Sequence, residues 1–86
     1  MDILSKFLER FRSFRLREQR LKEKTTRVIQ EIASIQIPIS QIKYKNGTIY
    51  LDVEAIIKSE IYLHKSSILE SLKARERGDF IIEDLR

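Results

Sequence analysis

The dipeptide Asn46-Gly47 constrains this chain more than any other feature, because it stands between two short runs in which apolar and polar residues alternate. Asn and Gly tolerate the positive φ angles of a two-residue type I′ turn, so the runs are predicted to form a β-hairpin. The turn fixes the register and pairs Ile42 with Leu51 and Ser40 with Val53. One face then carries Ile42, Tyr44, Ile49, Leu51 and Val53, and the other carries Gln41, Lys43, Lys45, Thr48, Tyr50 and Asp52.

Helical spacing precedes the hairpin. Five apolar residues recur at intervals of three and four and predict an amphipathic helix that begins near Asp2: Leu4, Phe7, Leu8, Phe11 and Phe14. From Arg15 to Arg27 strong helix formers continue with few apolar residues, which is typical of a solvated helix. Two alternatives stay open, a second helix capped by Thr25 or Thr26, or one helix through both segments. Either must end before Pro38, because proline lacks the donor N–H.

A helical pattern also follows the hairpin, from about Glu54 to Arg75. Its main apolar stripe contains Ile57, Ile61, Ile68 and Leu72, and Ile56 and Leu63 form a second stripe beside it. We therefore expect two partners to cover this helix, the hairpin sheet and an N-terminal helix. Gly78 is expected to end the helix. The branched apolar stretch at 79–86 then predicts a third strand.

The predicted fold is a small α+β domain of KH-like α(α)ββαβ order, in which a three-stranded sheet packs against a long helix. At 86 residues the chain supports one core of modest size. We expect residues 1–25 to form an amphipathic basic N-terminal helix and residues 26–86 to form the KH-like domain. The Gly-x-x-Gly loop with which KH domains clamp nucleic acid is missing from the sequence.

Positive charge is concentrated in the first third of the chain. Residues 1–27 hold nine lysines and arginines against four acids, a net charge of +5, while the remaining residues sum to −1. The cations expected to neutralise phosphates are Arg10, Arg12, Arg15, Arg17, Arg20, Lys22, Lys24 and Arg27. Lys43, Lys45 and Tyr50 on the outer hairpin face would extend this DNA- or RNA-binding surface. The alternative is a solvated helix face with i,i+4 ion pairs.

The apolar stripe of Leu4, Phe7, Leu8, Phe11 and Phe14 has three interpretations: part of the protein's own core, a surface for self-association or a protein partner, or a membrane-surface contact. We treat it as a candidate partner-binding surface. No apolar run approaches the roughly 20 residues that cross a bilayer, so no membrane partner is expected. The N-terminus is no signal peptide, and the chain is expected in the cytoplasm.

Catalytic and metal-binding residues are scarce. The chain has no Cys and one histidine, His64, which excludes common metal-ligand sets and nucleophile triads. We expect His64 to be a half-buried structural residue, hydrogen-bonded to Glu60. The acid pairs Asp52/Glu54 and Glu83/Asp84 suit capping and strand positions better than acid–base chemistry. The sequence therefore predicts no enzyme, no metal and no cofactor.

The unit from hairpin to helix resembles the bacterial DciA-like family, the domain of unknown function numbered 721. The resemblance covers roughly 26–86 and rests on Val28-Ile29, Ile32, Pro38, the segment from Lys45 to Val53, Ala55-Ile56, Glu60-Ile61, Ile68-Leu69 and the closing segment 82–86. Family members usually carry tryptophan at the position of Ile56, and fuller members have an extension that this short, stand-alone form lacks. The resemblance implies a KH-like fold, DNA binding, and an accessory role in DNA replication with the replicative helicase as partner.

Charge, pattern and resemblance together predict a non-catalytic nucleic-acid-binding accessory protein. The alternative is a protein-interaction or homodimerisation module that binds no nucleic acid.

Overall fold

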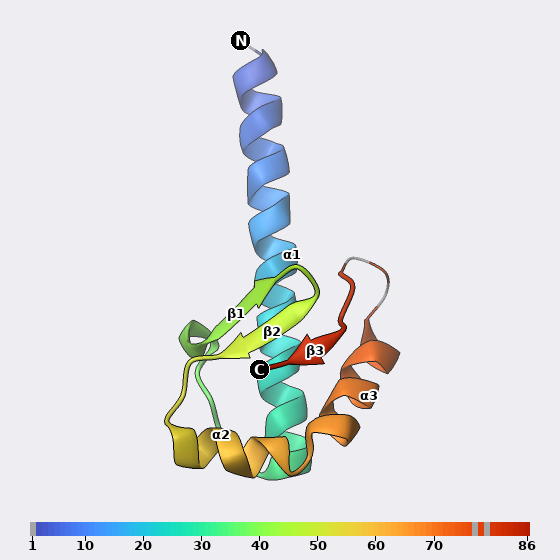
Figure 1. Ribbon diagram of the computed structural model, residues 1–86. Coiled ribbons are helices and arrows are strands. Elements are labelled where there is room, and N and C mark those ends of the chain that lie inside the picture. The colour runs from blue at the N-terminus through green and yellow to red at the C-terminus, as the bar shows by residue number, and fades with distance from the viewer. Residues whose placement is uncertain (1, 77, 79) are drawn as a thin grey trace.

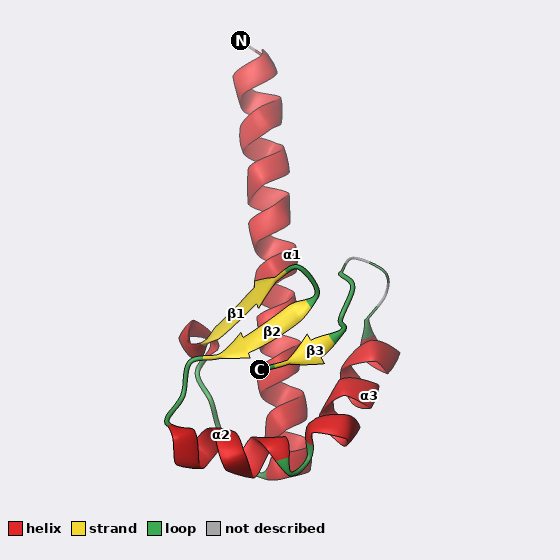
Figure 2. Ribbon diagram, in the orientation of Figure 1, coloured by secondary structure: helices red, strands yellow, loops and turns green. Residues whose placement is uncertain are grey.

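The computed structural model describes residues 2–76, 78 and 80–86, and leaves the side chains of residues 2, 3, 7 and 9–14 outside the description. The protein is α+β, with four helical segments and one three-stranded sheet among these residues (Figure 1; Figure 2). The elements follow in the predicted order, with one N-terminal helix, which is one of the two alternatives that the sequence left open. The helix after the hairpin is divided.

The N-terminal helix α1 (Asp2–Ala33) is continuous, which decides between the two alternatives left by the sequence. Thr25 is no cap. Its side chain is fully buried, and its hydroxyl donates a hydrogen bond of 2.8 Å to the carbonyl of Leu21 one turn earlier. The helix ends where Ser34 adopts a positive φ of 59° and donates its N–H to the carbonyl of Gln30. This left-handed residue ends the helix well before Pro38.

The hairpin is confirmed. Strands β1 (Ile42–Lys45) and β2 (Thr48–Leu51) pair in the predicted register, with Ile42 opposite Leu51 and Lys45 opposite Thr48. Asn46 and Gly47 have φ angles of 49° and 84°, as a type I′ turn requires. The predicted pair Ser40–Val53 lies outside this ladder, because the 3₁₀ turn η1 (Ile39–Gln41) precedes β1.

The single helix predicted from Glu54 to Arg75 is wrong in one respect. It is broken into α2 (Ala55–Tyr62) and α3 (Lys65–Arg75) by a turn at Leu63 and His64. The break lets α2 lie across the end of α1 while α3 runs beside α1 (Figure 1). Periodicity alone did not reveal the break, because the apolar positions on the two sides of it keep one helical phase.

The third strand, β3 (Asp84–Leu85), is shorter than predicted and lies parallel to β2, so the sheet is mixed with the order β1-β2-β3. Backbone bonds extend this pairing beyond the two residues: Arg86 donates to the carbonyl of Ile49, and Leu51 donates to the carbonyl of Arg86, each at 2.7 Å. A parallel neighbour requires a crossover connection, which α2 and α3 supply.

The sheet packs against a long helix, as predicted, but that helix is α1 rather than the helix after the hairpin (Figure 1). One core joins all layers and contains Leu21, Val28, Ile29, Ile37, Ile42, Ile49, Leu51, Ile61, Ile68, Leu72, Ile82 and Leu85. Since Leu21 belongs to this core, α1 crosses the expected boundary at residue 25 without interruption. Its N-terminal half extends past the other elements, and the molecule measures 51 × 25 × 20 Å (Figure 1).

Candidate nucleic-acid interface

Cations from two helices line an open groove of about 330 Å³, which we call the basic groove. Its lining consists of Arg17, Arg20, Leu21 and Lys24 of α1, Arg75 and Glu76 at the end of α3, and Phe80. Among the described residues of this lining, four cations and one carboxylate give a net charge of +3. The groove therefore carries most of its charge in one sign, which is typical of a site for anions.

Helical geometry explains why α1 supplies three of these cations. Arg17, Arg20 and Lys24 are spaced by three and four residues, so they project from one flank of the helix. Leu21 lies between them and is buried in the core, with an exposed fraction of 2%. The core contact of Leu21 therefore holds this flank of α1 against the end of α3.

Arg75 is fixed from the other side of the groove. Its Nη2 lies 2.6 Å from Oε2 of Glu31, and the Nζ of Lys24 lies 3.5 Å from its carbonyl oxygen. Both contacts join α3 to α1. Because Leu72, one turn earlier, is buried in the core, the packing of α3 brings Arg75 to the groove.

Phe80 separates the basic groove from a second hollow. This hairpin hollow has a volume of about 360 Å³ and is lined by Tyr44, Asn46, Gly47, Phe80, Ile81 and Glu83. The rings of Tyr44 and Phe80 meet edge to face at 5.0 Å, and the hydroxyl of Tyr44 donates a 2.6 Å hydrogen bond to the carbonyl of Ile81. These contacts hold the segment before β3 against the hairpin.

The structure brings only part of the predicted cation set to the basic groove, namely Arg17, Arg20 and Lys24. Arg15 and Lys22 line a different hollow together with Glu18, whose carboxylate lies 3.6 Å from the Nζ of Lys22. Arg27 is exposed and lines neither side of the basic groove. The predictions for Arg10 and Arg12 lie outside the described side chains.

The outer hairpin face has the predicted composition but forms a separate surface. Lys43, Lys45 and Tyr50 are exposed, and none of them lines the basic groove or the hairpin hollow. Sequence reasoning instead missed Arg75, Phe80 and Glu83. The sequence signals for these residues were weak: a cation at the end of a helix, an aromatic residue shortly after Gly78, and an acid just before a short strand.

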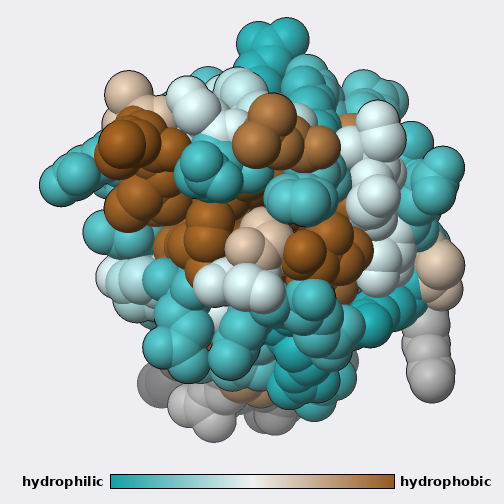
Figure 3. Space-filling view, turned by 90° about the horizontal axis from the view of Figure 1, so that it is seen from below, coloured by the Kyte–Doolittle hydropathy of each residue, from teal (hydrophilic) through white to brown (hydrophobic). Residues whose placement is uncertain are grey.

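Apolar side chains are exposed at both ends of the molecule. On α1, Leu4 and Leu8 have exposed fractions of 65% and 55%, while the predictions for Phe7, Phe11 and Phe14 lie outside the described side chains. At the other end, Ile56 and Leu63 are 72% and 74% exposed, so the prediction that a partner within the chain covers their stripe is wrong. Apolar groups gather among polar ones on this end (Figure 3).

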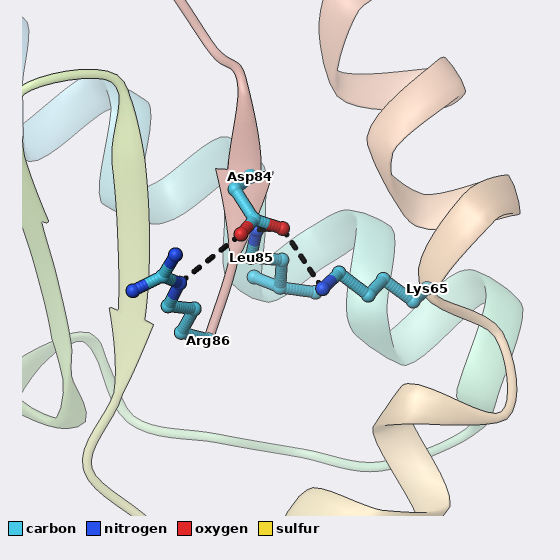
Figure 4. A network of polar contacts seen from close by, with 4 residues as sticks. All are labelled: Lys65, Asp84, Leu85 and Arg86. Carbon is cyan, nitrogen blue, oxygen red and sulfur yellow. Dashed lines mark hydrogen bonds and ion pairs between the residues drawn. The ribbon is translucent and has the colours of Figure 1, made fainter.

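Asp84 forms the main ion-pair network in the described part of the chain (Figure 4). Its Oδ1 lies 2.8 Å from the Nζ of Lys65 and its Oδ2 lies 3.1 Å from the Nε of Arg86, while the backbone N–H of Leu85 donates to Oδ1 at 2.8 Å. The Lys65 hydrogen bond first, and then those of Leu85 and Arg86, hold the pKa of the Asp84 carboxyl well below its usual range. The network ties β3 to α3 and is structural.

The predicted role of His64 is wrong. Its side chain is exposed at the turn between α2 and α3, where the chain changes direction, and the described residues give it no hydrogen bond to Glu60. Across the described residues, no group of three or more His, Cys, Asp or Glu side chains is arranged to hold a metal ion. None of the described helices is long and apolar enough to span a membrane.

Comparison of the chain with protein-family models, curated proteins and solved structures gave no match.

Proposed function

We propose that this protein binds nucleic acid without catalysing a reaction, and that phosphates lie in the basic groove. One observation carries the proposal: Arg17, Arg20 and Lys24 of α1 converge with Arg75 of α3 around a single groove. Cations held in one place neutralise neighbouring phosphates and release their counterions, which makes binding favourable and dependent on salt. If the same cations were distributed around a solvated helix, they would not act together on neighbouring phosphates.

The resemblance to the DciA-like family supports a more specific role, that of an accessory protein of DNA replication. In that role the protein would bind DNA, and its protein partner would be the replicative helicase. The groove chemistry itself recognises phosphodiesters and suits DNA and RNA alike.

The test compares two double variants of equal charge. Arg20→Gln with Lys24→Gln removes two cations from the basic groove, and Arg15→Gln with Lys22→Gln removes two from the opposite flank of α1, at about 100° of rotation per residue. Fluorescence anisotropy with labelled single-stranded and duplex DNA and RNA, repeated over a salt series, measures the affinity of each protein.

The slope of log affinity against log salt concentration counts phosphate contacts, at about 0.7 per contact for single strands. If the proposal holds, this slope is less steep by up to about 1.4 in the groove variant. The control variant keeps the slope and affinity of the native protein. Absence of any binding at low salt refutes the proposal, and so does an equal loss in both variants. Circular dichroism establishes that each variant is folded.

A second candidate function is protein interaction through the N-terminal half of α1. The specific observation in its favour is the exposure of Leu4 and Leu8 on a part of α1 that extends past the other elements (Figure 1). Size-exclusion chromatography with light scattering tests it directly. A dimer that Leu8→Glu dissociates and Lys6→Glu preserves supports self-association, whereas a monomer at all concentrations refutes it.

A further inference from the structure

The basic groove and the hairpin hollow meet at Phe80, which lines both. Their chemistry differs sharply. The described residues that line the groove include four cations, whereas those that line the hairpin hollow have one charged side chain, the Glu83 carboxylate. A phosphate is attracted to the first and repelled by the second, so one anionic group does not fill both.

The position of Glu83 is well defined by the backbone. Its N–H donates a 2.7 Å hydrogen bond to the carbonyl of Gly47, and its side chain passes close over the turn, with Cδ 3.2 Å from where a Gly47 Cβ would lie. No hydrogen bond or ion pair within the described residues engages the Glu83 carboxylate or the Asn46 side chain. Both retain their hydrogen-bonding capacity for a ligand.

We propose that the two sites act together on a single strand, with phosphates in the basic groove and one unpaired base in the hairpin hollow, between Phe80 and Glu83. This inference rests on the proposed function and narrows it. Phe80 and Ile81 offer apolar surface to the base, and Ile81 is 70% exposed. Stacking or apolar contact with the face of the base combines with cations on its backbone, as in other single-strand binders.

Duplex nucleic acid does not fit this arrangement. Bases inside a duplex are stacked and paired, so a base enters a hollow of about 360 Å³ only when it leaves the helix. Extruding a base carries an unstacking cost that a single strand does not have. The protein should therefore bind single strands more tightly than duplexes of equal charge.

The Glu83 carboxylate also selects among bases. An ionised carboxylate only accepts hydrogen bonds, so it favours a base edge with an amino group. Cytosine carries an N4 amino donor, as a carboxylate partner requires. Uracil carries a carbonyl oxygen at the same ring position, which the carboxylate repels. The two bases have nearly the same size and shape, and they differ also at N3, which is an acceptor in cytosine and carries a proton in uracil.

The experiment measures the affinity of the full chain for single-stranded oligonucleotides of about eight nucleotides, a length typical of small single-strand sites. Oligo-dC is compared with oligo-dU, the corresponding RNA pair shows whether DNA or RNA is preferred, and a duplex serves as reference. The variants are Phe80→Ala, Ile81→Ala and Glu83→Gln. Tyr62→Ala is the matched control, because Tyr62 is an exposed aromatic on α2 that lines neither the basic groove nor the hairpin hollow.

We expect single strands to bind at least tenfold more tightly than the duplex, and oligo-dC more tightly than oligo-dU. Loss of a base–aromatic contact weakens single-strand binding by about five- to a hundredfold in Phe80→Ala. Ile81→Ala weakens it less and, as an exposed substitution, keeps the test valid if Phe80→Ala unfolds. Glu83→Gln removes most of the preference for cytosine, and Tyr62→Ala changes nothing.

Equal affinity for single strands and duplexes, with no effect of Ile81→Ala or Glu83→Gln, overturns this inference. The proposed function survives that result, provided that the loss of Arg20 and Lys24 still weakens binding. Absence of all binding at low salt overturns both.

Discussion

Two adjacent threonines in α1 provide a sharp test of the packing. The hydroxyl of Thr26 is buried and has no hydrogen-bond partner among the described residues, whereas the hydroxyl of Thr25 donates to the carbonyl of Leu21 at 2.8 Å. Valine has nearly the shape of threonine and a similar helix propensity. Thr26→Val therefore removes an unsatisfied polar group, and Thr25→Val removes a satisfied one.

The two variants should change stability in opposite directions. A buried hydroxyl without a partner costs about 1–3 kcal/mol, so Thr26→Val should raise the free energy of unfolding by about 1 kcal/mol. Thr25→Val should lower it by about 0.5–1.5 kcal/mol, because the Leu21 carbonyl keeps its helical partner. In a domain of this size a difference of about 2 kcal/mol separates the two melting temperatures by about 10 °C.

Urea denaturation followed by far-UV circular dichroism measures both variants against the native protein. The denaturant dependence should stay constant, which shows that only stability has changed. Thr26→Ser is the control that keeps the hydroxyl and removes a methyl group, and it should not stabilise. A Thr26→Val protein that is equal to or less stable than the native protein refutes the reasoning, because the hydroxyl then has a partner.

Four further substitutions test the core, the ion-pair network and the turn. Ile29 is buried, so Ile29→Ala should lower the free energy of unfolding by about 2–5 kcal/mol, whereas Ile56 is exposed and Ile56→Ala should lower it by less than about 0.5 kcal/mol. Chemical denaturation measures both, and equal losses contradict the assigned burial. The lowered pKa of Asp84 means that its ionised carboxylate stabilises the folded state above the unfolded pKa near 3.9, and that this stability is lost as pH falls through the folded pKa. Asp84→Asn should therefore reduce the loss of stability at acid pH, measured as the free energy of unfolding across a pH series. An unchanged loss of stability contradicts the role of the network. Gly47→Ala should cost about 1–2 kcal/mol, because its φ is 84° and a Cβ would lie 3.2 Å from Glu83, and an unchanged melting temperature contradicts the turn geometry.

The hairpin was predictable because its determinants are local. Asn46 and Gly47 specify the turn, and alternation with a period of two specifies which side chains face the core. The break at His64 was not predictable from the spacing of apolar residues. Ile61 and Ile68, on either side of the break, have the spacing expected of one face of a single straight helix. The break depends instead on tertiary packing, in which α3 lies against α1.

The basic groove was only half predictable for a similar reason. The sequence locates the cations on α1, but eight of them between Arg10 and Arg27 surround the helix, and no local rule selects one flank. The selection comes from residues far away in sequence: Arg75, which pairs with Glu31 across 44 positions, and Phe80 beyond it. Such long-range juxtapositions follow from the fold and leave no periodic trace.

In both α1 and α3, residues that line the basic groove are neighbours of residues that are buried in the core. This explains how a domain with so small a core holds the open groove in place. Leu21 is buried between Arg20 and Lys24, and Leu72 is buried one turn before Arg75. Each wall of the groove is thus anchored by an apolar side chain next to its cations, so the spacing of the walls is set by core packing rather than by the charges. Loss of Leu72 should therefore abolish fold and binding together, whereas neutralising Arg20 should affect binding while the core remains intact.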